Sequence, residues 1–186
     1  MAKFTPAYRL TSKQEGGYAN HKNDKGKETY KGISRRYWPK WRGWTFIDAL
    51  KDIPNFPDNL EQVHDLDVLV KEFYLENFWN DLNLSSLTSQ AVANEVYDTA
   101  VNMGGKASVK MLQAACNLLN RDQKTFKDIK EDGVIGPKTL VAIQKSEEKY
   151  LLKILNVLQG CHYIGQLLDD STQEVFLRGW LKRVTI

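Results

Sequence analysis

The sequence predicts a mainly α-helical fold with one small β-hairpin or ordered loop. Apolar residues recur at intervals of three and four in several segments, which is the period of an amphipathic helix. Glycine or proline punctuates these segments at residues 16–17, 104–105 and 137. Residues 18–33 lack helical periodicity and carry a turn signal at residues 23–26, Asn-Asp-Lys-Gly, so we expect the hairpin or loop there.

The first helix is predicted from Thr5 to Gln14. Thr5 can act as its N-cap, and Pro6 suits the first turn because its missing N–H would have no partner there. Two glycines, Gly16 and Gly17, then end the helix. Further helices are predicted over residues 34–41, 45–51, 67–79, 89–103 and 107–119, from residue 138, from 146 to beyond 160, and over 172–182.

Composition places the chain among globular proteins that bury a core. Of its 186 residues, 42% are hydrophobic and 26% are charged. No run approaches the roughly 18 consecutive apolar residues of a membrane span. The first six residues, MAKFTP, lack the apolar centre of a signal peptide. We therefore expect synthesis in the cytoplasm and no stable membrane association.

Cysteine and histidine usage argues against metal or thiol chemistry. Cys116 and Cys161 lie far apart in helix-like surroundings, so we expect two buried thiols rather than a disulfide framework. The three histidines, His21, His64 and His162, are scattered, and neither an HExxH nor a CxxC spacing occurs. The sequence thus predicts no metal site and no cofactor.

Charge is distributed unevenly along the chain. Residues 1–45 hold 11 Lys and Arg against 3 Asp and Glu, whereas residues 46–186 hold 15 against 20. The N-terminal region is thus suited to a polyanion, which could be nucleic acid, an anionic membrane surface or bacterial cell wall. A solvated basic face without a partner is the alternative.

Glu15 has the predicted surroundings of a general acid. A glutamate has an ordinary pKa of about 4.3, and an acid that protonates a leaving group near neutral pH needs a higher value. A helix C-terminus and partial burial both disfavour the charged form. Asp24 and Thr29 follow in the predicted loop and are suited to hold a water molecule. The alternatives are a solvated glutamate, ordinary turn chemistry for Asp24 and a plain strand position for Thr29.

Aromatic residues are interleaved with Lys and Arg in the same region. Such rings can stack against sugars or nucleobases, and several can equally belong to the core. The residues concerned are Tyr18, Tyr30, Tyr37, Trp38, Trp41 and Trp44.

The N-terminal motif resembles the EGGY...ND..G.ET..GI signature of glycoside hydrolase family 108, which comprises bacterial and phage N-acetylmuramidases with a lysozyme-like fold. It consists of Glu15-Gly16-Gly17-Tyr18, Asn20, Asn23-Asp24, Gly26, Glu28-Thr29 and Lys31-Gly32-Ile33. Further matches run along the chain at residues 77–79 (NFW), 97–104 (YDTAVNMG), 112–115 (LQAA), 132–139 (DGVIGPKT) and 179–183 (GWLKR).

The resemblance implies that Glu15 is the catalytic acid and that Asp24 and Thr29 correspond to the second Asp and the Thr of phage-type lysozymes. Thr29 follows Asp24 after four residues rather than the five typical of those enzymes. Glu28 is a further carboxylate that competes for the second role. We expect substrate contacts from Tyr18, Asn20, Tyr30, Gly32, Tyr97, Asn102 and Gln113, with structural hydrogen bonding as the alternative for the last two.

The resemblance also implies two lobes packed as one compact body: a lysozyme-like catalytic lobe over residues 1–96 and a helical lobe over 97–186 that looks like a peptidoglycan-binding region. A boundary between helices is expected near Gly104-Gly105. For the turn at residues 132–139, the alternative is a packing element between helices that binds no ligand.

The function expected from the resemblance is cleavage of the β-1,4 bond between N-acetylmuramic acid and N-acetylglucosamine. We expect a cofactor-free monomer that acts on peptidoglycan glycan strands, at the cell wall or in the periplasm, after release as a phage endolysin or after export. Three alternatives stay open: a lytic transglycosylase, a non-catalytic wall-binding protein, and a nucleic-acid-binding protein.

Overall fold

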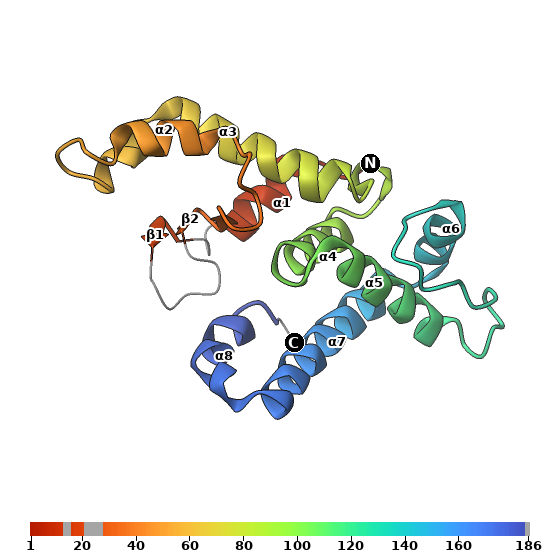
Figure 1. Cartoon of the computed structure of the whole chain (residues 1–186). Coiled ribbons are helices and arrows are strands. Elements are labelled where there is room, and N and C mark those ends of the chain that lie inside the picture. Colours follow the sequence, from red (N-terminus) through yellow and green to blue (C-terminus); the bar gives the residue numbers. More distant parts are fainter. Residues whose placement is uncertain (13–15, 21–27, 185–186) are drawn as a thin grey trace. The chain divides into compact units, whose positions relative to one another are not determined.

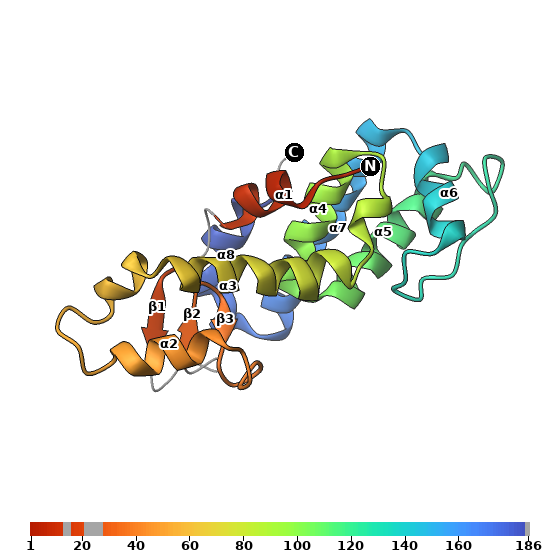
Figure 2. The same ribbon diagram turned by 90° about the horizontal axis from the view of Figure 1, so that it is seen from above.

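The computed structural model describes residues 1–12, 16–20 and 28–184 (Figures 1 and 2). The described residues form eight α-helices and one small antiparallel sheet, which confirms the predicted fold class. The chain divides into two compact units. One comprises residues 8–77, and the other comprises residues 1–7 together with residues 78–186.

The unit of residues 8–77 contains the sheet, whose strands follow the order β1 (Tyr18–Asn20), β2 (Glu28–Tyr30) and β3 (Ile33–Ser34) (Figure 2). The hairpin predicted over residues 18–33 is thus present and gains a third strand. Between β2 and β3 the chain turns through Lys31 and Gly32, with φ angles of 43° and 79°. Positive φ at both central residues is typical of a type I′ turn, and the glycine adopts it without strain.

The same unit contains α2 (Gly43–Leu50), which packs on α3 (His64–Tyr74). The 3₁₀ helix η2 (Asp58–Gln62) precedes α3, and the π-helical segment η3 (Leu75–Asn80) continues it. Side chains from these elements and from β3 form a core that includes Ile33, Trp44, Ile47, Leu66 and Val70.

The short helix predicted from Ser34 to Trp41 is wrong. Ser34 belongs to β3, where it pairs with Thr29, and its carbonyl accepts hydrogen bonds from the N–H groups of residues 37 and 38. Residues 35–42 instead form turns, and Pro39 cannot donate a backbone hydrogen bond to a helix. Ser34 therefore pairs in the sheet as part of a third strand, instead of capping a helix as expected.

The other unit is built on α4 (Gln90–Met103), α5 (Gly105–Leu119) and α7 (Glu148–Asp169), which pack against one another (Figure 1). Ser89 caps α4 by accepting a hydrogen bond from the N–H of Val92 at 3.1 Å. Gly104, with a φ of 90°, separates α4 from α5. The buried faces of these helices supply a core that includes Val96, Tyr97, Leu112, Cys116, Leu151 and Leu155.

The remaining α-helices agree with the expected order of helices, and two short 3₁₀ helices accompany them. They are α1 (Phe4–Thr11), η4 (Leu84–Ser86), α6 (Pro137–Lys145), η5 (Ser171–Gln173) and α8 (Glu174–Leu181). Pro137 begins α6, and α7 continues through Gly160, as predicted. None of the described helices has the length and apolar character needed to cross a membrane.

Two expectations differ from the structure. A lobe boundary between residues 96 and 97 would fall inside α4, which is continuous there. The two compact units instead divide within α1 and within η3. Cys116 is buried as expected, whereas Cys161 is exposed because it lies on an outward position of α7.

Candidate functional site

The three predicted catalytic residues belong to the N-terminal part of the chain. Glu15 and Asp24 lie outside the described residues, so the structure says nothing about their surroundings. Thr29 occupies the middle of β2, opposite Ala19 of β1, and is half-buried. Because successive strand residues face opposite sides of a sheet, its hydroxyl lies on the face opposite Glu28.

Glu28, the competing carboxylate, is surrounded by partners and is only 8% exposed. Its Oε2 atom lies 2.6 Å from Nε of Arg35. Its Oε1 atom lies 2.9 Å from Nζ of Lys51 and accepts a hydrogen bond of 3.0 Å from the Tyr18 hydroxyl. Partial burial and this bond to Glu28 raise the pKa of Tyr18. Both oxygens of the Glu28 carboxylate are therefore engaged within the protein.

Asp48 of α2 completes this ionic cluster. Arg35 donates to both of its carboxylate oxygens, with distances of 2.6 and 2.9 Å, and Lys51 lies 2.8 Å from Oδ1. The hydrogen bonds from Arg35 and then Lys51 lower the pKa of Asp48 to about 2. The cluster thus ties β2 and the end of β3 to the last turn of α2.

The predicted substrate contacts of the sheet differ in accessibility. Asn20 and Gly32 are exposed, and Tyr18 is half-buried with its ring edge-on to Phe56 at 4.8 Å between centroids. Tyr30 is only 1% exposed and belongs to the core. The surface of this sheet therefore offers Asn20, the Lys31-Gly32 turn and part of Tyr18 to a ligand.

The other predicted contacts lie in the unit of residues 1–7 and 78–186. They are Tyr97, Asn102 and Gln113. Tyr97 is 1% exposed and packs edge-on against Trp79 at 6.0 Å. Asn102 is exposed and donates a hydrogen bond of 2.7 Å to the backbone carbonyl of Asp98. Asn102 is thus the one of these three whose side chain a ligand can reach.

Gln113 is buried and organises the turn that precedes α6. Its amide nitrogen donates to Asp132 Oδ1 at 2.9 Å, to the Val134 carbonyl at 3.1 Å and to Thr139 Oγ1 at 3.1 Å. Its amide oxygen accepts from the N–H of Gly133 at 2.9 Å. These bonds give Gln113 a structural role in the DGVIGPKT segment.

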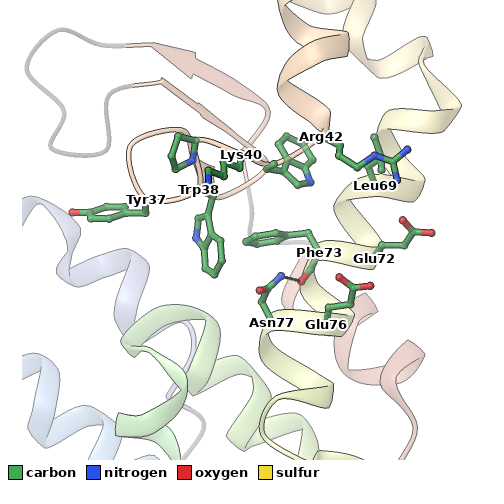
Figure 3. Close-up of a pocket in the computed structure, with 11 residues that line it drawn as sticks. Tyr37, Trp38, Lys40, Arg42, Leu69, Glu72, Phe73, Glu76 and Asn77 are labelled. Carbon is green, nitrogen blue, oxygen red and sulfur yellow. Dashed lines mark hydrogen bonds between the residues drawn. The ribbon is translucent and has the colours of Figure 1, made fainter.

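A pocket of about 470 Å³ lies in the unit of residues 8–77 (Figure 3). One wall is the chain between β3 and α2, and the other is α3 with the beginning of η3. The rings of Trp38 and Phe73 meet edge-to-face at 4.8 Å between centroids. The lining comprises Tyr37, Trp38, Pro39, Lys40, Trp41, Arg42, Leu69, Glu72, Phe73, Glu76 and Asn77.

The loop that forms the first wall is fixed by hydrogen bonds and ring contacts. The Trp38 carbonyl accepts from the backbone N–H of Trp41 at 3.1 Å and from the indole N–H of Trp44 at 2.8 Å. The Trp41 ring packs edge-on against Trp44 at 5.1 Å, and the Arg35 guanidinium lies 4.5 Å from the centre of the Trp44 ring. The wall is thus preorganised before any ligand binds.

The second wall was not predicted as part of a site. Leu69, Glu72, Phe73, Glu76 and Asn77 are spaced by three and four, which places them on one helical face. By their helical spacing alone, the apolar members of this face are expected to lie in the core. Glu72 and Glu76, which are four residues apart, are the sequence signal that this face is exposed to solvent.

Comparison with known proteins gives two family matches in succession. The family described as Glycosyl hydrolase 108 matches residues 8–104, and the family described as Predicted Peptidoglycan domain matches residues 107–185. The first match ends at residue 104 and the second begins at residue 107. Among solved structures, the chain is similar to one titled "Structure of Brucella abortus SagA", with a TM-score of 0.65 and 25% sequence identity over 96% of this chain and 87% of that chain. No curated protein matches this chain.

Proposed function

Because the chain belongs to the glycosyl hydrolase 108 family, we propose that it is an N-acetylmuramidase that cleaves the β-1,4 bond between N-acetylmuramic acid and N-acetylglucosamine. Family membership makes it a glycoside hydrolase, and the second match identifies peptidoglycan as its substrate. The observation that carries the finer proposal is the EGGY motif at residues 15–18 within the first match. The site of action is accordingly the cell wall.

In the proposed mechanism, Glu15 protonates the glycosidic oxygen of the leaving sugar. The anomeric carbon then gains positive character, its bond to the leaving oxygen breaks, and a water molecule adds to it while a carboxylate of the site takes the proton that the water loses. Asp24 and the Thr29 hydroxyl orient that water or stabilise the charge that develops on the sugar. No metal or organic cofactor takes part in this proposal.

The choice of Asp24 over Glu28 as the second carboxylate rests on the partners of Glu28. Both Glu28 oxygens have partners at 3.0 Å or less, and the side chain lies in the ionic cluster that joins the sheet to α2. A group that receives a proton from water, or that positions water, needs an accessible oxygen. Glu28 in this arrangement serves stability, which leaves Asp24 for the reaction.

The test is the Glu15→Gln variant, assayed by the clearing of a suspension of purified cell walls. We expect a folded protein that has lost wall hydrolysis, because glutamine fits the same space and cannot donate a carboxyl proton. Glu61→Gln, at an exposed position of η2, is the matched control and should clear walls at the wild-type rate. A Glu15→Gln protein with full activity would show that another group is the acid.

The products distinguish hydrolysis from the lytic transglycosylase reaction. Hydrolysis adds water and leaves a reducing N-acetylmuramic acid, whereas a transglycosylase leaves a 1,6-anhydro sugar. Mass spectrometry of the released muropeptides should show reducing ends. A wall-binding protein without activity would sediment with walls and release no soluble fragments.

A further inference from the structure

The pocket of residues 37–42 and 69–77 presents charges of both signs around an aromatic surface. Lys40 and Arg42 come from the loop, whereas Glu72 and Glu76 come from α3 and η3. All four side chains are exposed, and within residues 1–12, 16–20 and 28–184 none of them forms an ion pair. Figure 3 shows Arg42, Glu72 and Glu76 projecting to the same side. These charges are therefore available to a ligand.

Resting on the function proposed above, we propose that this pocket binds the peptide stem of peptidoglycan. The N-acetylated sugars are neutral, and the carboxyl group of muramic acid is used up in the amide link to the peptide. The stem carries the free carboxylates, together with the ammonium group of its diamino acid. A pocket with both cations and anions therefore complements the peptide rather than the glycan.

Each wall of the pocket carries groups that complement a different part of the peptide stem. Carboxylates of the stem meet Arg42 and Lys40, and its ammonium group meets Glu72 and Glu76, through charge-assisted hydrogen bonds. The methylene chain of the diamino acid lies against Trp38, which is 39% exposed although it is a large aromatic residue. This contact would select glycan strands that still bear their peptides.

The direct test is calorimetric titration of the full chain with the N-acetylated tetrapeptide N-acetyl-L-alanyl-γ-D-glutamyl-meso-diaminopimelyl-D-alanine, whose N-terminal nitrogen is an amide as in the wall. We expect binding to the wild type, weakened about tenfold by Arg42→Gln and by Glu76→Gln, the loss expected for one partly exposed charge-assisted contact. Lys71→Gln and Asp65→Asn are matched controls, since both residues are exposed on α3 outside the pocket. They should leave peptide affinity unchanged.

The disaccharide of N-acetylglucosamine and N-acetylmuramic acid, without peptide and with its lactyl carboxyl group blocked as the primary amide, gives the decisive comparison. We expect it not to displace the tetrapeptide. Displacement by the disaccharide would overturn the proposal in favour of a sugar subsite, and so would the absence of tetrapeptide binding, or binding that Arg42→Gln and Glu76→Gln leave unaffected.

A kinetic readout separates this inference from the proposed function. The ratio of KM for peptide-free strands to KM for peptide-bearing strands should fall about tenfold in Arg42→Gln, in line with the weaker peptide binding. If neither substrate is cleaved, the proposed function fails, while the calorimetric result still decides peptide binding. If both are cleaved with the same KM ratio in wild type and variant, the peptide-stem proposal fails and the hydrolase proposal stands.

Discussion

Glu28 on β2 and Arg35, which follows β3 directly, form an ion pair with 2.6 Å between Oε2 and Nε. The backbone N–H of Arg35 also donates to the Glu28 carbonyl at 2.8 Å. The Arg35 guanidinium also donates hydrogen bonds to the Asp48 carboxylate on α2. A single side chain therefore links the hairpin to α2, the helix that follows the pocket loop. The carboxylate beside the predicted catalytic Thr29 is thus part of the scaffold.

Replacing Glu28 by glutamine should destabilise the protein without abolishing wall hydrolysis. Glutamine keeps the shape but leaves Arg35 and Lys51 without their anion, which we expect to cost about 2 kcal/mol of unfolding free energy. Urea unfolding measures the loss, and wall clearing measures activity. Asp52→Asn, at an exposed position, is the control and should change stability by less than about 0.5 kcal/mol. A stable Glu28→Gln protein without activity would assign the second carboxylate to Glu28 instead.

The long helices could be predicted from the sequence because their stability depends on local patterns. In α4, for example, Ser89 supplies the cap, apolar residues recur on one face and Gly104 ends the helix. The strand β3 could not be predicted in this way. It contains only Ile33 and Ser34, too few residues for an alternating pattern, and its existence depends on pairing with β2.

The site was predictable only where its signal is local. The aromatic loop of residues 37–44 stands out in the sequence, but its partner wall on α3 does not. Phe73 is 6% exposed and satisfies the core pattern, although it also lines the pocket. The tertiary arrangement decides which face of an amphipathic helix borders a cavity. A single sequence does not contain that arrangement.

Gln113→Leu should destabilise the protein through the turn before α6. The leucine side chain fills a similar volume but leaves the Gly133 N–H, Asp132 and Thr139 without their shared partner. We expect a loss of about 3 kcal/mol in urea unfolding and faster hydrogen exchange at the Gly133 amide. Gln144→Leu, at an exposed position of α6, is the control and should have a small effect. Unchanged stability in Gln113→Leu would contradict a structural role for this glutamine.

Gly43→Ala and Gly165→Ala should have opposite effects, although both glycines are helical. A Cβ atom on Gly43 would overlap with three carbons of the Trp41 ring, so the ring must move. We expect a loss of about 1–3 kcal/mol and a changed near-UV circular dichroism spectrum. A Cβ atom on Gly165 meets nothing within 4 Å, so the same change in α7 should stabilise by about 0.5–1 kcal/mol. A stabilising Gly43→Ala would show that Trp41 is free to reorient.

Glu95 on α4 is a carboxyl group whose environment disfavours its charge. Burial is the largest cause, and the neighbouring Asp98 adds to it, so that the pKa of Glu95 is raised to about 7. The hydrogen bond with the Asn156 side chain from α7 acts in the opposite direction without cancelling the shift. One of its oxygens, Oε1, is buried and has no hydrogen-bond partner among the described residues.

Glu95→Gln should therefore make the protein more stable at alkaline pH. A carboxyl group whose pKa rises from 4.5 in the unfolded chain to about 7 in the folded one favours folding fully below pH 4.5, and that contribution is lost as the pH rises through 7. The full shift corresponds to about 3 kcal/mol. Urea unfolding at pH 4, 6 and 8 should show similar stability for wild type and Glu95→Gln at pH 4 and a growing advantage for the variant above it. Glu61→Gln, at an exposed position, is the control and should show no such divergence. A stability difference that stays constant from pH 4 to pH 8 would mean that Glu95 titrates alike in the folded and unfolded chain.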